Sequence, residues 1–157
     1  MPCRGHSTKT EEPFWSEEWK KAGLKATQAP STSVMQKVLF IETGMGCDQH
    51  GSREEHGATK AAIRACRNAI EFNSIPCIQD IVPGGRAGMK IHLKLGIPEE
   101  ANGVDLDQVR AVFPYGQLLP IEVVNGGLTF QSGRVVEQLG DEKDLAVIVL
   151  ACVTVGY

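Results

Sequence analysis

The residues best suited to chemistry lie between residues 44 and 51, in the stretch GMGCDQHG directly after the apolar run Val38–Ile41. Glycines that let the backbone turn sharply at the end of a strand are a common setting for functional side chains. Asp48 and His50 are two residues apart, so in extended backbone they share a face. An aspartate beside a histidine fixes its tautomer and supports a general base. The spacing predicts an acid–base pair in a glycine-rich loop, with Asp48 and His50 as the catalytic residues.

Other interpretations of the same stretch stay open. Asp48 can instead form a turn with its own backbone, with His50 packed on a neighbour. Cys47 and His50 form a Cys-x-x-His half-site for a metal, which His56 or His92 would have to complete. A catalytic metal held by Asp48, His50 and a distant histidine is another alternative. The sequence contains no second half-site with ligand spacing, so we predict no metal. Cys47 as a nucleophile activated by His50 is a further alternative.

Three features suggest that the ligand is a small anion. Gly44-x-Gly46 follows a strand, although the next helix begins about a dozen residues too late for a typical phosphate loop. Arg86 lies in the glycine-rich segment 83–88, which can close over an anion or serve only as a connector. Lys60 lies in the first turn of a predicted helix, where a cation is unfavourable for the helix dipole unless it binds an anion. We predict Lys60 and Arg86 as substrate-binding residues, and the cofactor is unknown.

Composition excludes several classes of protein. The chain has 157 residues with 42% hydrophobic residues and a net charge of −3, which fits one domain with a real core. The sequence has no basic block, so nucleic acid is not an expected partner. The longest apolar run, Leu145–Val155, is too short to span a bilayer, so no membrane partner is expected either. Five cysteines without a C-x-x-C pair, and no signal peptide, favour a cytoplasmic location.

Residues 1–36 differ from the rest of the chain. They are rich in Ser, Thr, Lys, Glu and Pro and show no apolar periodicity. We interpret them as a mobile N-terminal extension, with a cluster of Phe14, Trp15 and Trp19 that is able to dock as one helical turn. Residues 37–157 are predicted to form a single domain.

Apolar periodicity predicts the elements of this domain. Ala58–Phe72 has apolar residues at helical spacing, and Met89–Ile97 alternates in the manner of a half-buried strand. Asn125-Gly126-Gly127 is typical of a hairpin turn. In chain order we expect a strand over Lys37–Glu42, a helix over Ala58–Phe72, a strand over Met89–Ile97, a short helix over Asp105–Phe113, a hairpin of Leu119–Val124 and Leu128–Gln131, and a strand over Asp144–Val155.

This order of strand, helix, strand, helix, hairpin and strand predicts an α+β fold. Strand–helix–strand crossovers favour parallel pairing and a hairpin is antiparallel, so the sheet is expected to be mixed. Two helices can cover one face only, which gives a two-layer sandwich. The last strand is apolar on both faces, so the open face is expected to pack on a second copy of the chain. We therefore predict a homo-oligomer.

Five segments together resemble a conserved hypothetical family of bacteria and plants that is named for a Listeria Lin-locus protein. They are Phe40–Gly51, Ala58–Ala65, Met89–Ile91 with Leu95–Pro98, Phe113–Gly116 and Gly126–Leu128. The resemblance implies a shared fold over Lys37–Tyr157 and brings no established activity. The positions that match the family's Gly-x-Asp-x-His-Gly and Thr-Lys patterns are Gly46, Asp48, His50, Gly51, Thr59 and Lys60. We add Thr59, Gly46 and Gly51 to the expected substrate-binding residues on this basis.

Two classes of function are consistent with the sequence. The first is an oligomeric enzyme that acts on a small anionic metabolite, with Asp48 and His50 in acid–base roles and hydrolysis or proton transfer as the simplest reactions. The second is a non-catalytic small-ligand-binding or assembly module, in which the glycines serve packing.

Overall fold

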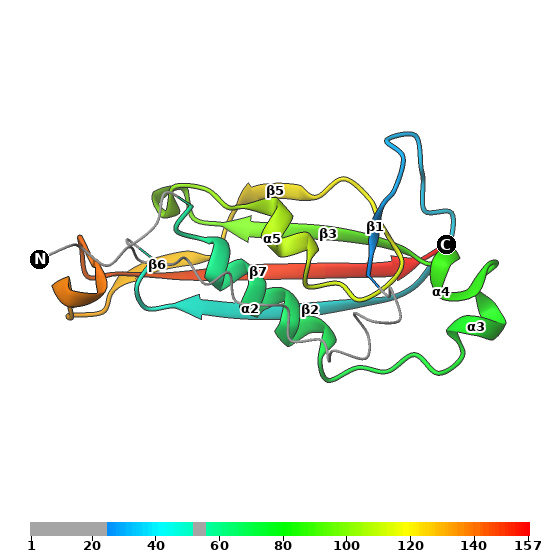
Figure 1. The fold of residues 1–157 in the computed structure, drawn as a ribbon, viewed down its shortest axis with the longest axis horizontal. Helices are drawn as coiled ribbons and strands as arrows, with labels where there is room; N and C mark the ends of the chain where they lie inside the picture. Colours follow the sequence, from blue (N-terminus) through cyan, green and yellow to red (C-terminus); the bar gives the residue numbers. More distant parts are fainter. Residues whose placement is uncertain (1–24, 52–55) are drawn as a thin grey trace, which may run out of the picture.

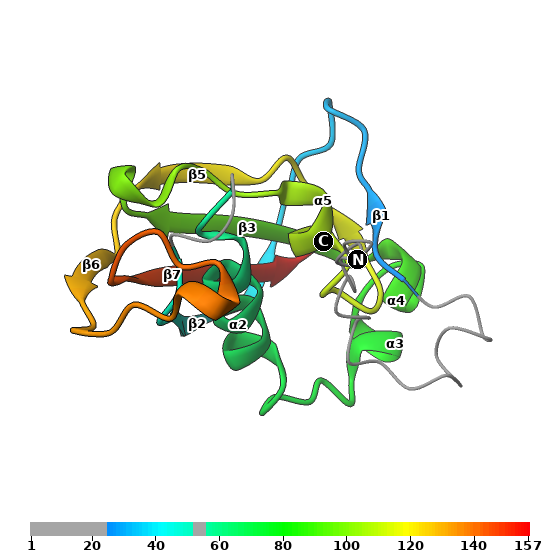
Figure 2. The ribbon, with the colours of Figure 1, turned by 60° about the vertical axis from the view of Figure 1, so that its left-hand side comes forward.

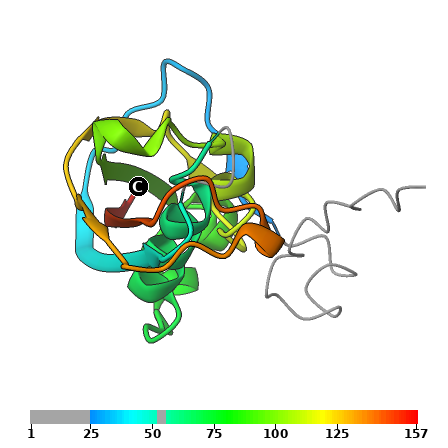
Figure 3. The same cartoon turned by 90° about the vertical axis from the view of Figure 1, so that its left-hand side faces the viewer.

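The structure is a computed structural model, and it describes residues 25–51 and 56–157. It has two layers, a mixed seven-stranded sheet and a layer of helices against one face (Figures 1 and 3). The helices are α2 (Thr59–Ile70), α3 (Ile78–Ile81), α4 (Gly85–Gly88) and α5 (Leu106–Arg110), with 3₁₀ turns η1 (Glu99–Ala101) and η2 (Glu137–Leu139). The strands are β1 (Thr27–Gln28), β2 (Val38–Asp48), β3 (Lys90–Ile97), β4 (Gln117–Leu118), β5 (Glu122–Asn125), β6 (Leu128–Gln131) and β7 (Leu145–Gly156). The predicted α+β sandwich is confirmed.

The central strand of the sheet is β7. It pairs antiparallel with β2 on one side, from Val38 opposite Gly156 to Asp48 opposite Val147. On its other side it pairs antiparallel with β3 and, further along, with β6. The outer edge of β3 carries β4 and β5, both parallel to it. The main path of the sheet is therefore β1-β4-β3-β7-β2.

The predicted hairpin is wrong. β5 pairs parallel with β3, and β6 pairs antiparallel with β7, so β5 and β6 run in the same direction on different partners. Gly126 and Gly127 carry the chain across the end of β3. A Cβ atom at residue 126 would lie 3.1 Å from the Cα atom of Gly96, and Gly127 has φ of 68°. The glycines therefore connect two strands that pair with different partners, and they do not form the turn of a hairpin.

The first long strand extends further than predicted. The sequence places its end at Glu42 and a loop from Gly44 onward, but β2 continues to Asp48. Gly44 and Gly46 are thus strand residues that face α2. Their missing Cβ atoms allow the helix to lie directly on the strand, because a Cβ at residue 44 would be 2.2 Å from the carbonyl oxygen of Ala65.

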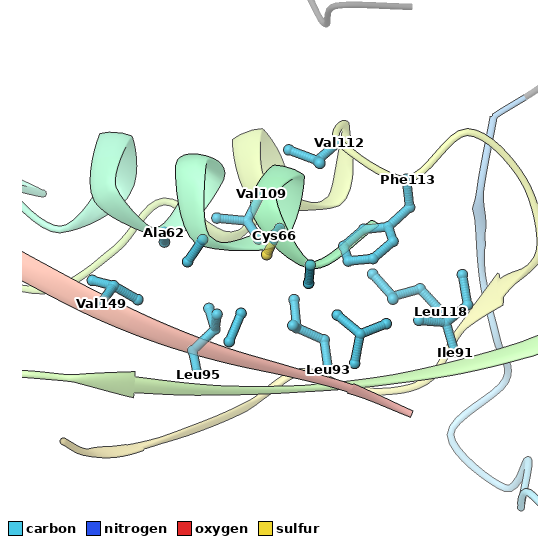
Figure 4. Close-up of a cluster of buried hydrophobic side chains, with 14 of the residues drawn as sticks. Ala62, Cys66, Ile91, Leu93, Leu95, Val109, Val112, Phe113, Leu118 and Val149 are labelled. Atoms are coloured by element: carbon cyan, nitrogen blue, oxygen red, sulfur yellow. The ribbon is translucent and has the colours of Figure 1, made fainter. Parts of the chain in front are cut away.

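The core lies between the helices and the sheet (Figure 4). Strand β3 shows the predicted alternation, with Leu93 and Leu95 fully buried and Lys94 exposed between them. From the helix layer, Cys66 of α2 and Val109 of α5 point into the same space. Burial raises the pKa of the Cys66 thiol to about 12, so it serves as a small apolar side chain here.

The two longer helices occur where the sequence predicts them. Helix α2 lies within the predicted range Ala58–Phe72. Helix α5 ends at Arg110, whereas the sequence predicts a helix that continues to Phe113. Asp105 caps α5 by accepting from the backbone amides of Asp107 and Gln108, and the amide of the Gln108 side chain donates back to it. No helix in the described part of the chain is long and apolar enough to cross a membrane.

Residues 25–36 are joined to the sheet. β1 pairs parallel with β4, Ala29 is buried, and the amide of Lys37 donates to the carbonyl oxygen of Tyr157. The described domain therefore begins before residue 37, where the sequence analysis places its start. Phe14, Trp15 and Trp19 lie outside the described residues.

Candidate functional site

An imidazole and a buried carboxylate meet at the end of the sheet where β2 ends and β7 begins. The Nδ1 atom of His50 lies 2.8 Å from the Oδ2 atom of Asp141. The side chain of Asp141 is fully buried, whereas that of His50 remains 25% exposed. A buried carboxylate is held in place by such contacts, since leaving it without partners is costly. We call this pair the His50–Asp141 dyad.

Two loops carry the residues of the dyad, and the later one, in orange, follows β6 in Figure 2. His50 follows β2, and the amide of Gly51 donates to the carbonyl oxygen of Leu145 at the start of β7. The segment 132–144, which includes η2, folds back over this end of the sheet. There the backbone amide of Val136 donates to the Oδ2 atom of Asp141 at 2.8 Å. Gly140, with φ of 85°, allows the turn that returns the chain to β7.

Asp48 contacts the backbone of His50. Its Oδ1 atom accepts from the backbone amide of His50 at 3.1 Å, which is the turn-forming alternative named above. The partner of the imidazole is Asp141, 91 residues further along the chain. Sequence reasoning missed Asp141 because its segment, GDEKD, has the composition of a solvated acidic turn. Asp48 shapes the turn that presents His50, and Asp141 orients the ring.

The geometry defines what His50 can do. An ionised carboxylate only accepts, so in the neutral imidazole the Nδ1–H group of His50 donates to the Oδ2 atom of Asp141. The lone pair is then on Nε2, and none of the described residues hydrogen-bonds to that atom. A partly exposed imidazole with a carboxylate behind Nδ1 is the arrangement of a general base.

Cations from α2 lie beside this site. The Nη1 atom of Arg64 donates to the carbonyl oxygen of Cys47 at 2.6 Å and lies 3.9 Å from the Oδ1 atom of Asp48. Lys60 is half-buried one helical turn earlier, on the same side of α2. Because α2 runs antiparallel to β2, this turn lies toward the end of the strand that carries Asp48.

Thr59, Gly46 and Gly51 have structural contacts. The hydroxyl oxygen of Thr59 accepts from the backbone amide of Asp105 at 2.9 Å, which ties α2 to the start of α5. Gly46 lies against the backbone of α2, and a Cβ atom on Gly51 would lie 2.4 Å from a methyl group of Val147. The hydrogen bond explains why residue 59 has a hydroxyl group, and the close contacts explain why residues 46 and 51 are glycines.

Arg86 lies away from the dyad. It belongs to α4, which precedes β3 at the end of the sheet where β2 starts, whereas His50 follows the other end of β2 (Figures 1 and 2). The structure therefore separates Arg86 from the other predicted binding residues. Among the described residues no group of three or more His, Cys, Asp or Glu side chains is arranged to hold a metal ion.

The mixed sheet with one helical layer defines the protein as a two-layer α+β domain. Its sequence from residue 38 to residue 155 matches the Lin0512 family of conserved hypothetical proteins, and the chain belongs to that family. Among solved structures, it is similar to an FtsZ-like protein of unknown function from Nostoc punctiforme. The two are 37% identical over 78% of this chain and 97% of that one, with a TM-score of 0.65. No curated protein matches the sequence significantly.

Proposed function

We propose that this protein is an enzyme that acts on a small anionic metabolite, with His50 as its general acid–base residue. The observation that supports this is the 2.8 Å contact between His50 Nδ1 and the fully buried Asp141 carboxylate. In the proposed reaction, Nε2 of His50 takes a proton from water or from the substrate and later returns it. Asp141 acts as a positioning residue and stabilises the imidazolium that forms in between.

The charges around the dyad favour an anionic substrate. The side chain of Arg64 is 48% exposed, and Lys60 lies one turn away on the same helix. A guanidinium and an ammonium on one side of a site bind carboxylate or phosphate groups. Hydrolysis and proton transfer are the reactions that this set of groups performs most simply.

Nitrophenyl esters provide a direct test of general-base chemistry. We expect the purified protein to release nitrophenolate faster from an ester with a carboxylate-bearing acyl group than from the acetate ester. His50→Gln removes the base and should lower the rate about 100-fold. Asp141→Asn should lower it less, and it should shift the pH profile because the imidazole loses its carboxylate partner.

His92→Gln is the matched control, since His92 contacts a carboxylate of Glu122 at 3.6 Å on another part of the sheet. It should leave the rate unchanged. Equal rates for the wild type and His50→Gln would refute the proposal, and so would an equal loss in His92→Gln.

A second candidate function, assembly, is favoured by the open face of the sheet. The residues of β2, β6 and β7 that point away from the helices include large apolar side chains that are about half exposed, namely Ile41, Met45, Leu128 and Leu150. A hollow of about 560 Å³ is lined by two of them, Met45 and Leu150, and by Lys94. Burial of such side chains contributes roughly 1.5–3 kcal/mol each, which supports a homo-oligomer formed through this face.

Sedimentation equilibrium tests the assembly. We expect a mass above the 17.0 kDa of one chain, and Leu150→Lys should reduce it to that of the monomer. Phe72→Lys is the control, because Phe72 is 83% exposed but follows α2 on the helical side. A monomeric wild type at micromolar concentration would refute the oligomer without affecting the dyad.

A further inference from the structure

A cavity of about 550 Å³ lies on the helical side of the sheet, at the end remote from the dyad. It exists because α2 has 12 residues and is roughly 18 Å long, while β2 has 11 and is about twice that length. Helix α2 ends at Ile70, and the rest of this face is covered by the α3–α4 segment and residues 113–115. The cavity is the space left between these covers, and its volume is typical of a small-molecule site.

Most of its wall is apolar. The floor is formed by the helix-facing side chains of β3 and β7, and the sides by the residues that follow α2 and precede β4. These residues include Ile70, Ile75, Met89, Ile91, Phe113 and Val153. Such a wall suits an aromatic or large aliphatic group.

The wall also carries a carboxylate that has no partner among the described residues. Glu42 pairs with Val153 across the sheet, so its side chain is on the helical side and lines the cavity. Burial raises its pKa, and no described residue forms a hydrogen bond or ion pair with its carboxylate. A partly desolvated carboxylate of this kind is stabilised by a ligand that brings a donor.

A guanidinium lines the same cavity. Arg86 of α4 is exposed and lies 5.6 Å from the ring centroid of Tyr115, another lining residue. Stacking on the ring limits the conformations of the long side chain. A guanidinium held in this way presents its donors to a carboxylate.

We propose that this cavity binds a small zwitterion of the hydrophobic amino-acid class. Its apolar side chain would lie on the β3–β7 floor, its carboxylate would contact Arg86, and its ammonium group would contact Glu42. The site is independent of the dyad, because Glu42 lies six residues before Asp48 in β2 and Arg86 lies at the opposite end of the sheet.

Isothermal titration of the full chain with three probes tests the proposed chemistry. L-Phenylalanine carries both charges, 3-phenylpropionate lacks the ammonium group, and 2-phenylethylamine lacks the carboxylate. We expect L-phenylalanine to bind at least about tenfold more tightly than either of the others, because each loses one charge-assisted contact. Failure of L-phenylalanine to bind, or equal affinities for all three probes, would overturn the proposal.

Variants locate the binding to this cavity. Arg86→Gln should weaken the binding of L-phenylalanine about tenfold or more and leave the binding of 2-phenylethylamine, which has no carboxylate, unchanged. Glu42→Gln should weaken the binding of L-phenylalanine to a similar extent and leave the binding of 3-phenylpropionate, which has no ammonium group, unchanged. Arg134→Gln and Glu137→Gln make the same charge changes at exposed positions near η2 and should have no effect.

Ser74→Trp provides a second approach that leaves the charges intact. Ser74 is exposed on the loop after α2 and lines the cavity, so an indole there should block binding without disturbing the core. Thermal unfolding of each variant confirms that it is folded. Unchanged binding in both Arg86→Gln and Ser74→Trp would place the ligand elsewhere and refute the site.

Discussion

Gly46 of β2 lies against Ala61 of α2 so closely that a Cβ atom at residue 46 would be 2.0 Å from the carbonyl oxygen of Ala61. The atom that it would meet is backbone, so neither side can yield through a rotamer change. We expect Gly46→Ala to lower the free energy of unfolding by about 2–3 kcal/mol, because overpacking separates the helix from the sheet. Urea denaturation measures the change.

Gly96→Ala is the control for this prediction. Gly96 is also a strand glycine, but the nearest atom to a Cβ there is 3.5 Å away, which is an ordinary contact. Gly96→Ala should lower the free energy of unfolding clearly less than Gly46→Ala does. Equal losses in the free energy of unfolding at the two positions would show that the close contact with α2 is not what makes Gly46→Ala costly.

The same glycines show why only part of the fold follows from the sequence. Strand β3 was predicted because Leu93 and Leu95 alternate with polar residues, and a half-buried strand imposes that period. Strand β2 was predicted only in its first half, because Gly44 and Gly46 have poor strand propensity. What keeps them in a strand is the contact with α2, which no local pattern encodes.

Asp141 should contribute to stability as well as to the dyad. Asp141→Ala removes the acceptor of both the His50 ring and the Val136 amide, leaving a backbone donor unpaired. We expect a loss of about 2–3 kcal/mol in the free energy of unfolding, measured by urea denaturation. Glu142→Ala changes an exposed neighbour and should cost less than about 0.5 kcal/mol. If Asp141→Ala left the free energy of unfolding unchanged, the result would contradict the contacts described.

The dyad also marks the limit of sequence reasoning about the site. His50 was identified because a histidine near glycines at a strand end is a recognisable local pattern. Asp141 was not, since its carboxylate is buried only when segment 132–144 folds over the end of the sheet, and a short acidic turn gives no sign of that. Local spacing favoured Asp48, which instead bonds to the backbone of the same turn.

Glu42 should make stability depend on pH. Its folded-state pKa is raised above the ordinary 4.5 because burial disfavours the charged form. The folded protein therefore holds this proton more tightly than the unfolded chain, and the free energy of unfolding falls as pH rises from about 4.5 to above the folded pKa. Glu42→Gln removes this penalty. We expect it to raise the melting temperature relative to the wild type at about pH 7 and to have little effect at about pH 4.

Glu137→Gln makes the same change of charge on the exposed η2 turn and is the control for Glu42→Gln. Its melting temperature relative to the wild type should be the same at both pH values. If Glu42→Gln lowers the melting temperature at neutral pH, the carboxylate has a stabilising partner, and the desolvation argument is wrong.

Cys66 and Cys77 should differ sharply in reactivity toward iodoacetamide. Thiolates are the reactive species, and with a pKa of about 12 and no exposed surface the Cys66 thiol is almost entirely protonated near neutral pH. Cys77 is exposed at the start of α3. In the native protein we expect Cys77 to be labelled within minutes and Cys66 only after urea is added, as read by mass spectrometry of the peptides. Cys77→Ser removes the fast label and provides the control. Labelling of native Cys66 at the rate of Cys77 would mean that α2 opens readily from the sheet, because the thiol can reach the reagent only if the α2–β7 contact separates.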